Sequence, residues 1–431
     1  MKGLKALVVL LAVAILCVGC EDRCCKKSKE KKYDKVLILY QAGCNSLSEN
    51  LREDIHEFTQ GDLPAAGDDK AIVIVGHHPT SYGLYGVKTK PCIIRLYKDK
   101  KGTPVLDTLT RLGESDFLTK KEVMARSLNY VAETFKSDHY GMIFASHGTG
   151  WLPIDYYGHP DKYQVATGGT GAKVAPRITF PSGPVLYEET EPLPGPKVRS
   201  FGEERTNEGG TQYSYEMDIK DLAAGIPFHF DYILMDICLM GCVEVAYELK
   251  DKCSFLGFSP TEILADGLDY TKIAARLLKS GDPDIKGVLD DYYECYSSQS
   301  GDYQSASYSL IDCSKLEALA AACRTAFEDG RTAIATVRPS SVQPLFRASH
   351  HWFYDLKDIL DQAGAGSSAV DRALAECVSY EIHTPAFMPR SGGFTFRTYC
   401  GLSMYLPNNG SAYLDDYYKT LAWNKATSLV Q

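Results

Sequence analysis

Unbroken apolar runs alternate with amphipathic stretches along most of the first half of the chain. Apolar positions recur with helical spacing over 46–58 and 118–135, which predicts two helices. Continuous apolar runs are typical of strands that are buried on both faces of a parallel sheet. The pattern therefore predicts an α/β fold, a three-layer α/β/α sandwich with a mostly parallel central sheet. The predicted strands are 35–41, 71–76, 92–97, 140–146 and 232–237.

The second half continues the alternation of strands and helices. Residues 394–399 and 401–407 alternate between apolar and polar positions as strands do, and 413–423 has the spacing of a closing helix. These segments predict a C-terminal α/β extension of the same fold. The other predicted elements are strands at 254–258 and 306–312 and helices at 241–249, 270–279, 284–296 and 314–337.

The alternation is interrupted between about residues 155 and 215. This stretch is rich in glycine and proline, which predicts a long irregular insertion. Exposed loops of this kind are where proteolytic nicking concentrates. The insertion offers several bonds that follow a basic residue, and the sequence does not select one of them. The basic residues are Lys162, Lys173, Arg177, Lys197, Arg199 and Arg205.

The N-terminus has the pattern of an export signal. Two lysines precede an apolar run at 6–18, and Gly19 and Cys20 close it. The run is too short for a spanning helix. We expect residues 1–19 to be a signal peptide of the bacterial lipoprotein type, with Cys20 lipidated, and 20–33 to be a charged tether. The expected localisation is the cell envelope, lipid-anchored at the outer membrane or cell surface, with a plain secretory signal as the alternative.

Composition and charge narrow the class of protein. Apolar residues make up 45% of the 431 residues and charged residues 23%, which is the usage of a globular protein with a large core. The formal net charge of -9 argues against a nucleic-acid partner, which needs a basic face. The 14 cysteines are spread through the chain, and no Cys-x-x-Cys motif occurs beyond Cys17–Cys20 at the end of the expected signal peptide, which disfavours a structural zinc site and a thiol oxidoreductase. Most of them are expected to be small buried hydrophobic residues.

Two predicted strands end on reactive side chains. The run 140–146 leads directly to His147 and Gly148, and the run 232–237 leads to Cys238. In parallel sheets chemistry occurs at the carboxyl ends of strands, so neighbouring strands would bring these residues together. A thiolate is a nucleophile, and a nearby imidazole activates it. The backbone amides of Gly148 and Cys238 could then bind the oxyanion of the intermediate.

Other interpretations of these residues stay open at this level. A cysteine at a strand end is often buried packing, and a single histidine is often a structural residue. His77 and His78 follow another strand and are rival imidazoles. We rank them lower than His147 because no glycine follows them and Pro79 turns the chain away.

Several motifs together resemble those of clostripain-like cysteine peptidases, which belong to the caspase-like clan. The segments Ser146–Trp151 and Asp236–Leu249 resemble the histidine and cysteine motifs of that family. Further similar segments extend the resemblance to residues 34–424, which we interpret as one peptidase domain. The resemblance implies a caspase-like fold and endopeptidase activity, with His147 as base and Cys238 as nucleophile. The further segments are Ser259–Glu262, Gly267, Tyr270, Ser309–Asp312, Asp355–Leu356, Gly401–Pro407, Tyr417–Tyr418 and Leu421–Trp423.

Two positions depart from the family pattern. Ile237 stands where the family often has alanine, between Asp236 and Cys238. Cys242 follows one expected helical turn beyond Cys238, where many relatives have no cysteine. Pairing of the two thiols would silence the enzyme, although neighbouring helix positions seldom have disulfide geometry.

Asp236 is the candidate for substrate recognition. It stands two residues before Cys238, so on a strand both side chains point to the same side of the sheet. The family's preference for Arg or Lys before the cleaved bond fits a carboxylate at this place. The alternative is a strand-end aspartate that caps the next helix.

The resemblance also implies how the enzyme is controlled. Relatives are commonly activated by cleavage between the two motifs, which here is the insertion. Some need calcium, and although no cofactor is expected for catalysis itself, Ca²⁺ stays possible by resemblance alone. Asp415 and Asp416 are acidic but form no ligand loop of known spacing, and no metal site is predicted. The competing hypothesis is a catalytically silent surface lipoprotein that binds peptide or glycan.

Overall fold

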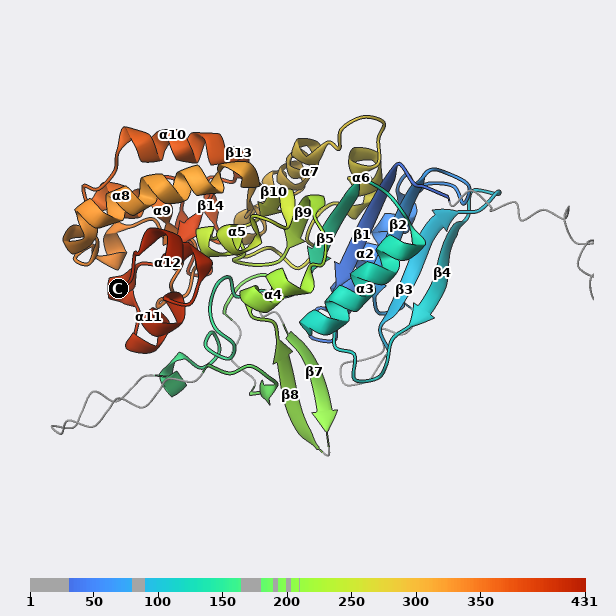
Figure 1. Ribbon diagram of the computed structural model, residues 1–431, viewed down its shortest axis with the longest axis horizontal. Coiled ribbons are helices and arrows are strands. Elements are labelled where there is room, and N and C mark those ends of the chain that lie inside the picture. Colours follow the sequence, from blue (N-terminus) through green and yellow to red (C-terminus); the bar gives the residue numbers. More distant parts are fainter. Residues whose placement is uncertain (1–30, 80–89, 164–179, 189–192, 199–202, 209) are drawn as a thin grey trace, which may run out of the picture. The chain divides into compact units, whose positions relative to one another are not determined.

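The computed structural model describes residues 31–79, 90–163, 180–188, 193–198, 203–208 and 210–431 (Figure 1). The expected signal peptide and Cys20 lie outside the described residues. Residues 33–431 form one compact unit. Within the described part of the chain, no helix combines the length and the apolar character needed to cross a bilayer.

A nine-stranded sheet forms the centre of this unit, in the order β13-β11-β10-β9-β5-β1-β2-β3-β4. The five central strands are parallel, and only β3 and β11 run against the others. This confirms the expected mostly parallel sheet. The strands are β1 Lys35–Gln41, β2 Lys70–Gly76, β3 Cys92–Lys98, β4 Pro104–Arg111, β5 Tyr140–Ala145, β9 Phe230–Asp236, β10 Cys253–Phe258, β11 Ser307–Asp312 and β13 Val378–His383.

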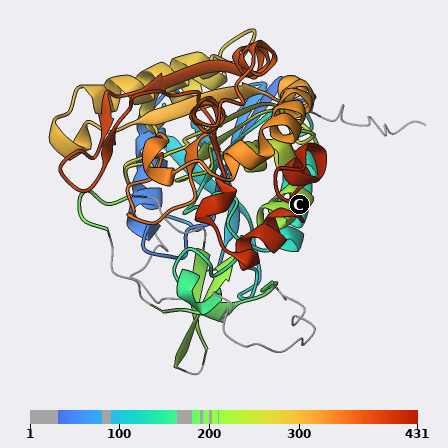
Figure 2. The same cartoon turned by 90° about the vertical axis from the view of Figure 1, so that its left-hand side faces the viewer.

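Helices cover both faces of the sheet, which confirms the three-layer architecture (Figure 2). One layer contains α2 (Ser48–Gln60), α6 (Tyr270–Leu277) and α7 (Ile285–Ser297), which pack against one another in that order. The other helices form the opposite layer. Within it, α3, α4, α5, α12 and α8 pack against one another in that order. The helices of this layer are α3 Lys121–Thr134, α4 Ile219–Gly225, α5 Val243–Leu249, α8 Leu316–Ile334, α9 Leu356–Gln362, α10 Ser368–Cys377, α11 Ala412–Tyr418 and α12 Ala422–Thr427.

The expected elements differ from the observed ones mainly at the edges and near the C-terminus. Strand β4 and strand β13 were not predicted, because an edge strand is partly exposed and lacks an unbroken apolar run. The expected strands 394–399 and 401–407 are wrong, because only the pairs β15 (Phe394–Thr395) and β16 (Ser403–Met404) form ladders. The alternation in this region comes from irregular backbone whose side chains pack on the core. The expected single closing helix is divided into α11 and α12.

The insertion is less irregular than the sequence predicts. It contains a small antiparallel sheet in the order β6-β8-β7, and the β7–β8 hairpin projects away from the main sheet (Figures 1 and 2). Alternating residues on β8 include a buried Ser214 between more exposed neighbours. The strands are β6 Val185–Leu186, β7 Glu203–Glu208 and β8 Thr211–Glu216.

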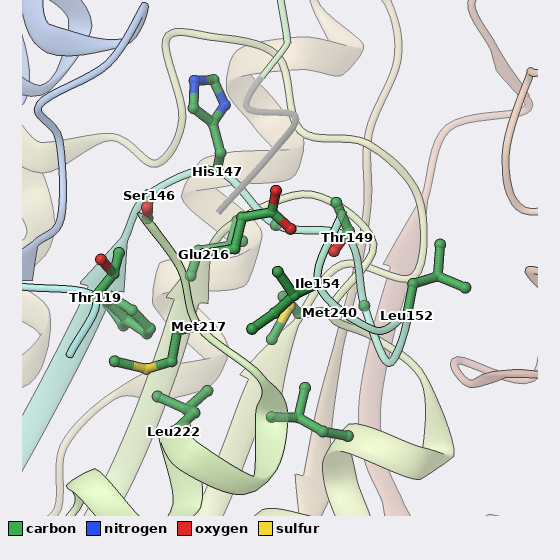
Figure 3. Close-up of a pocket in the computed structure, with 15 residues that line it drawn as sticks. Thr119, Ser146, His147, Thr149, Leu152, Ile154, Glu216, Met217, Leu222 and Met240 are labelled. Atoms are coloured by element: carbon green, nitrogen blue, oxygen red, sulfur yellow. The ribbon is translucent and has the colours of Figure 1, made fainter. Parts of the chain in front are cut away.

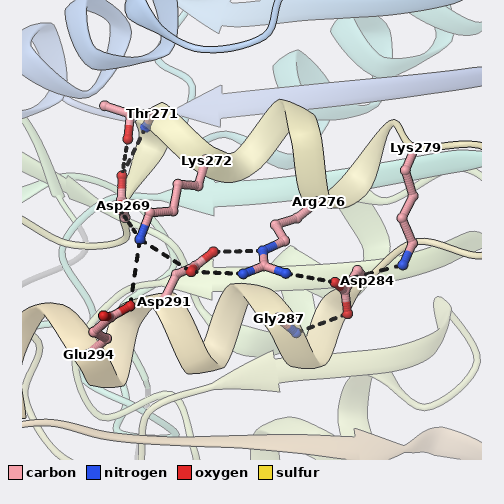
Figure 4. A network of polar contacts seen from close by, with 9 residues as sticks. All are labelled: Asp269, Thr271, Lys272, Arg276, Lys279, Asp284, Gly287, Asp291 and Glu294. Atoms are coloured by element: carbon pink, nitrogen blue, oxygen red, sulfur yellow. Dashed lines mark hydrogen bonds and ion pairs between the residues drawn. The ribbon is translucent and has the colours of Figure 1, made fainter.

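A charged network joins α6 to α7 (Figure 4). Arg276 on α6 donates to both carboxylate oxygens of Asp291 at 2.8 and 3.0 Å, and to Asp284 at 3.0 Å. Lys272 contacts Asp291 at 3.3 Å. A paired guanidinium of this kind combines charge with fixed geometry. The network therefore fixes α6 against α7.

Glu244 on α5 is a buried carboxyl group in the opposite layer. Its Oε1 accepts hydrogen bonds from the Tyr418 hydroxyl at 2.7 Å and from the Tyr405 amide at 2.9 Å. Burial raises the pKa of Glu244 to about 7, from a usual value near 4.5. The folded protein therefore binds this proton more tightly than the unfolded chain, and stability is lost as the pH rises from about 4.5 to 7.

Replacing Glu244 with glutamine is expected to remove this pH dependence, because the amide keeps the shape of the protonated acid. Between pH 5 and pH 8 the wild type should lose about 2–3 kcal/mol of unfolding free energy relative to Glu244→Gln. Urea denaturation of both proteins at the two pH values measures the difference. An equal difference at pH 5 and pH 8 would contradict the assignment.

Candidate active site

The strands β5 and β9 are neighbours, and their carboxyl ends meet. They pair in parallel with Ala145 opposite Asp236. Apart from Asp231, all residues of both strands are buried, which is why each appears in the sequence as a nearly continuous apolar run. His147 follows one strand by two residues and Cys238 follows the other by two. The structure thus places the two residues on the same edge of the sheet, as the sequence predicts.

Gly148 lets the two strand ends approach closely. A Cβ atom at this position would lie 2.1 Å from Cγ2 of Ile237 and 2.8 Å from the carbonyl oxygen of Cys238. Only glycine fits this contact between backbones. The expected oxyanion residues, Gly148 and Cys238, therefore lie directly against each other.

The thiol of Cys238 is fully buried and faces the backbone of Ile263. The Ile263 amide donates a hydrogen bond to Sγ at 3.0 Å, and Sγ lies 3.5 Å from the Ile263 carbonyl oxygen, to which the thiol donates. An N–H group directed at sulfur stabilises negative charge on it. The segment that follows β10 therefore holds the sulfur.

The imidazole of His147 contacts a third loop. Its Nε2 and the hydroxyl of Ser46 share a hydrogen bond at 3.1 Å. Ser46 lies between β1 and α2, and β1 is the next strand beside β5. A hydrogen bond to one ring nitrogen orients the other and selects the tautomer. The sequence contained no signal for Ser46, because the contact joins residues 101 positions apart.

Asp236 lies in the core at the end of β9. Its Oδ2 accepts a hydrogen bond from the Tyr270 hydroxyl at 2.8 Å and from the Leu268 amide at 3.4 Å. The side chain has no exposed surface. Tyr270 and Leu268 belong to the start of α6 and the loop before it. The N-cap residue of α5, the helix that follows β9, is Cys242 and not Asp236. Neither cavity beside His147 includes Asp236 in its wall.

The rival imidazoles follow β2, two strands away from β5. His77 is buried and lies 3.5 Å from the carboxylate of Glu204 on β7. The Thr119 amide donates to the same carboxylate at 3.1 Å. The pKa of the half-buried His78 is lowered by burial and by Arg111. His77 thus joins the insertion to the main sheet, three strands away from the β9 end that carries Cys238.

Two cavities adjoin His147. The larger has a volume of about 910 Å³ and is lined by Ser46, His147, Glu262, Arg347 and much of the insertion, including 193–198. The smaller, of about 40 Å³, lies below the His147 backbone, and the ring points away from its apolar side chains Met217, Leu222 and Ile154 (Figure 3). Only the larger cavity has room for part of a peptide.

The described cysteines are all thiols, and most of them are buried. Cys242 is buried but does not lie one helical turn from Cys238, which corrects the sequence expectation. The backbone between them is not helical, because Leu239 has a φ of 62° and α5 begins only at Val243. Burial raises the pKa of Cys242 well above its usual value, so this thiol is kept neutral.

Acidic residues do not gather into a cation site in the described part of the chain, where no group of three or more His, Cys, Asp or Glu side chains could hold a metal ion. Asp415 accepts a hydrogen bond from the Tyr405 hydroxyl at 2.9 Å, and Asp416 pairs with Lys419 at 2.9 Å. The two carboxylates serve different partners.

Comparison with known protein families gives a match over most of the chain. Residues 39–163 and 211–428 match the model of the clostripain family, and the gap between them lies within the insertion. No curated protein matches the chain.

Solved structures share the fold. An inactive zymogen of a C11 protease from Parabacteroides distasonis is 24% identical, with a TM-score of 0.69, over 92% of this chain and 98% of that chain. A secreted C11 cysteine protease from Bacteroides thetaiotaomicron, iotapain, is 23% identical, with a TM-score of 0.69, over 92% and 99% of the two chains. A secreted C11 cysteine protease of the same organism bound to an irreversible peptide inhibitor has a TM-score of 0.67 at 23% identity, over 91% and 98%. With the family match over most of its length, the chain belongs to the clostripain family and is a cysteine-type peptidase.

Proposed function

We propose that the protein is an endopeptidase that cleaves after Arg or Lys, with Cys238 as nucleophile and His147 as general base. The observation that carries the proposal is the junction of β5 and β9, where Gly148 packs against the backbone of Cys238. Family membership supplies the reaction class, and the geometry supports this pair of residues over His77 and His78.

In the proposed reaction the Cys238 sulfur, as thiolate, attacks the carbonyl carbon of the scissile bond. The imidazole of His147 takes up the thiol proton and then gives it to the leaving amine, so that an acyl-enzyme remains. Water, deprotonated by His147, hydrolyses the thioester and restores the thiol. The amides of Gly148 and Cys238 bind the oxyanion in both halves of the reaction. Sγ has to leave the backbone of Ile263 before it attacks.

Asp236 is proposed to give the site its preference for basic residues. A fully buried carboxylate at the end of the nucleophile's strand favours a positive charge nearby, and its contacts with Tyr270 and Leu268 hold it in place. The resemblance to the family and the position two residues before Cys238 support this role.

The proposed specificity is tested with fluorogenic peptides that differ only in the residue before the cleaved bond. Asp236→Ala is expected to lower kcat/KM for Lys and Arg peptides by two to three orders of magnitude, because a buried charge pair broken on one side costs about 3–5 kcal/mol. Asp231→Ala, at the exposed opposite end of β9, is the matched control and should change kcat/KM less than threefold. The midpoint of urea denaturation verifies that Asp236→Ala still folds. Equal hydrolysis of Lys peptides by wild type and Asp236→Ala would refute the assignment.

Self-processing and the membrane anchor complete the proposal. An inactive zymogen is known for the Parabacteroides distasonis protein, and the insertion of this chain contains several bonds that follow a basic residue. Iotapain is a secreted protein, which agrees with an export signal here. The lipid anchor rests on Cys20 alone, and mass spectrometry of the mature N-terminus would test it.

A further inference from the structure

Two buried cysteines lie in contact at one end of the β10–β11 pair. The Sγ atoms of Cys253 and Cys313 are 3.8 Å apart, and the two residues are 1% and 5% exposed. We propose that Cys253 and Cys313 form a disulfide bond in the exported protein. This bond goes beyond the proposed peptidase activity, in which neither thiol takes part. It takes the expected export as its premise, because disulfides form and persist outside the reducing cytosol.

The backbone places both cysteines just outside the ladder between the two strands. The antiparallel pairing of β10 with β11 ends at Phe255, opposite Asp312. Cys253 is the first residue of β10, and Cys313 begins the 3₁₀ turn that follows β11. Bond formation brings the sulfur atoms from 3.8 Å to about 2.05 Å. Because neither residue belongs to the β10–β11 ladder, a change of side-chain rotamer and a small shift at the strand ends allow this without breaking the ladder.

Formation of the bond is an oxidation that needs a second reactant. Two S–H bonds break and one S–S bond forms, while two protons and two electrons pass to an oxidant whose own disulfide becomes two thiols. The oxidant class is a dithiol–disulfide oxidoreductase of the cell envelope, which acts by thiol–disulfide exchange.

The buried position of the pair determines when this exchange takes place. The contact with Cys313, followed by burial, raises the pKa of Cys253 well above its usual value, so the folded thiols are neutral. Exchange requires a thiolate that the oxidant can reach. The bond therefore forms while the chain folds after export, and the fold then shields it from reductants.

The bond closes a loop that carries part of the proposed active site. The two cysteines are 60 positions apart, and the loop contains α6, α7 and the charged network between them (Figure 4). In the same loop, the Ile263 amide contacts the Cys238 sulfur at 3.0 Å and the Tyr270 hydroxyl binds Asp236 at 2.8 Å. A cross-link removes conformational freedom from the unfolded chain, and it removes more for a longer loop. The disulfide therefore stabilises the segment that contacts the proposed nucleophile and the proposed specificity residue.

A third buried thiol competes for Cys313. Cys377 is the last residue of α10 and directly precedes β13, the other neighbour of β11. Burial, and then the charge of Cys313, raises the pKa of Cys377 above its usual value, so these two residues are near each other. The direct contact of the sulfur atoms favours Cys253 as the partner of Cys313.

The first test locates the bond by mass spectrometry. The mature chain, residues 20–431, is carried into a bacterial periplasm by a host export signal, and a second preparation stays in the cytoplasm. Both proteins are alkylated with iodoacetamide in denaturant and digested with trypsin without reductant. We expect peptide 253–272 to be linked to peptide 287–315 in the exported protein only. The second peptide also contains the exposed Cys295, and fragment ions in which Cys295 is alkylated assign the bond to Cys313.

Sensitivity to a reductant provides a second measurement. Dithiothreitol should lower the urea midpoint of the exported wild type by at least about 0.5 M, because the unfolded chain regains the freedom of a long loop. Cys253→Ala should have the same midpoint with and without dithiothreitol, since it has no bond to break. Cys377→Ala, which removes the competing buried thiol, is the matched control and should keep the full response.

Alkylation of both Cys253 and Cys313 in the exported protein would overturn the inference, as would a bond from Cys313 to Cys377. Neither measurement uses peptide hydrolysis, so the result is separate from that of the proposed function. An exported protein that cleaves no peptide refutes the proposed function, whereas linked peptides 253–272 and 287–315 still support the disulfide.

Discussion

Replacing Cys238 with alanine is expected to abolish hydrolysis of every peptide in a fluorogenic panel. We expect kcat/KM to fall by at least about 10⁴-fold, because the thioester intermediate can no longer form and the remaining groups provide only binding and oxyanion stabilisation. The insertion should also stay uncut on denaturing gels, if processing is self-catalysed. Both readouts come from the same preparation, so loss of activity and loss of processing can be compared directly.

Cys242→Ala is the matched control for this prediction. Cys242 is also buried and lies four residues further along the chain, but its neutral thiol has no place in the proposed reaction. Its replacement should change kcat/KM less than threefold. A large loss in Cys242→Ala, together with activity in Cys238→Ala, would transfer the nucleophile to the other thiol.

Replacing His147 with alanine is expected to lower kcat/KM by about 10²–10⁴-fold, the usual contribution of a positioned general base. The thiol also loses the imidazolium that stabilises its charged form, so alkylation of Cys238 by iodoacetamide should shift to higher pH. Measuring the alkylation rate between pH 5 and 10 separates this effect from misfolding, which would expose the buried thiols at every pH.

His78→Ala tests the rival imidazole in the same assay. His78 lies at the end of β2 and is half-buried, so its removal should leave both kcat/KM and the alkylation profile near those of the wild type. A loss equal to that of His147→Ala would reverse the assignment. His139→Ala, just before β5 and exposed, provides the control for a histidine change next to the same strand.

Much of the central fold could be predicted from local pattern. The strands β1, β2, β5 and β9 are buried on both faces, so each needs a continuous apolar run that the sequence displays. Edge strands have no such requirement, and β4 and β13 were missed for that reason. Near the C-terminus the alternation of Phe394 and its neighbours predicted strands, because a loop that packs one side on the core produces the same period.

The placement of His147 and Cys238 at one edge of the sheet could be predicted for a related reason. Parallel strands end at a common edge, so two reactive residues that each follow a buried strand can be inferred to meet if the strands are neighbours. The sequence could not prove that β5 and β9 are adjacent, and the structure supplies that fact. The reason why residue 148 has to be glycine also became visible only in the structure. A Cβ atom at this position would lie 2.1 Å from Cγ2 of Ile237.

The sequence by itself determined the order of the central strands and most of the helices, the reactive residues at two strand ends, and a glycine- and proline-rich insertion. These features follow from the burial of each segment and from its local chemistry. Both determine the residue types at neighbouring positions of the sequence. Tertiary structure alone decided the contacts between distant segments: Ser46 with His147, Ile263 with Cys238, Arg347 with Glu262, and Lys197 with Ala265. Each depends on how the layers pack and on the register at a strand edge, and no local period in the sequence encodes a partner many residues away.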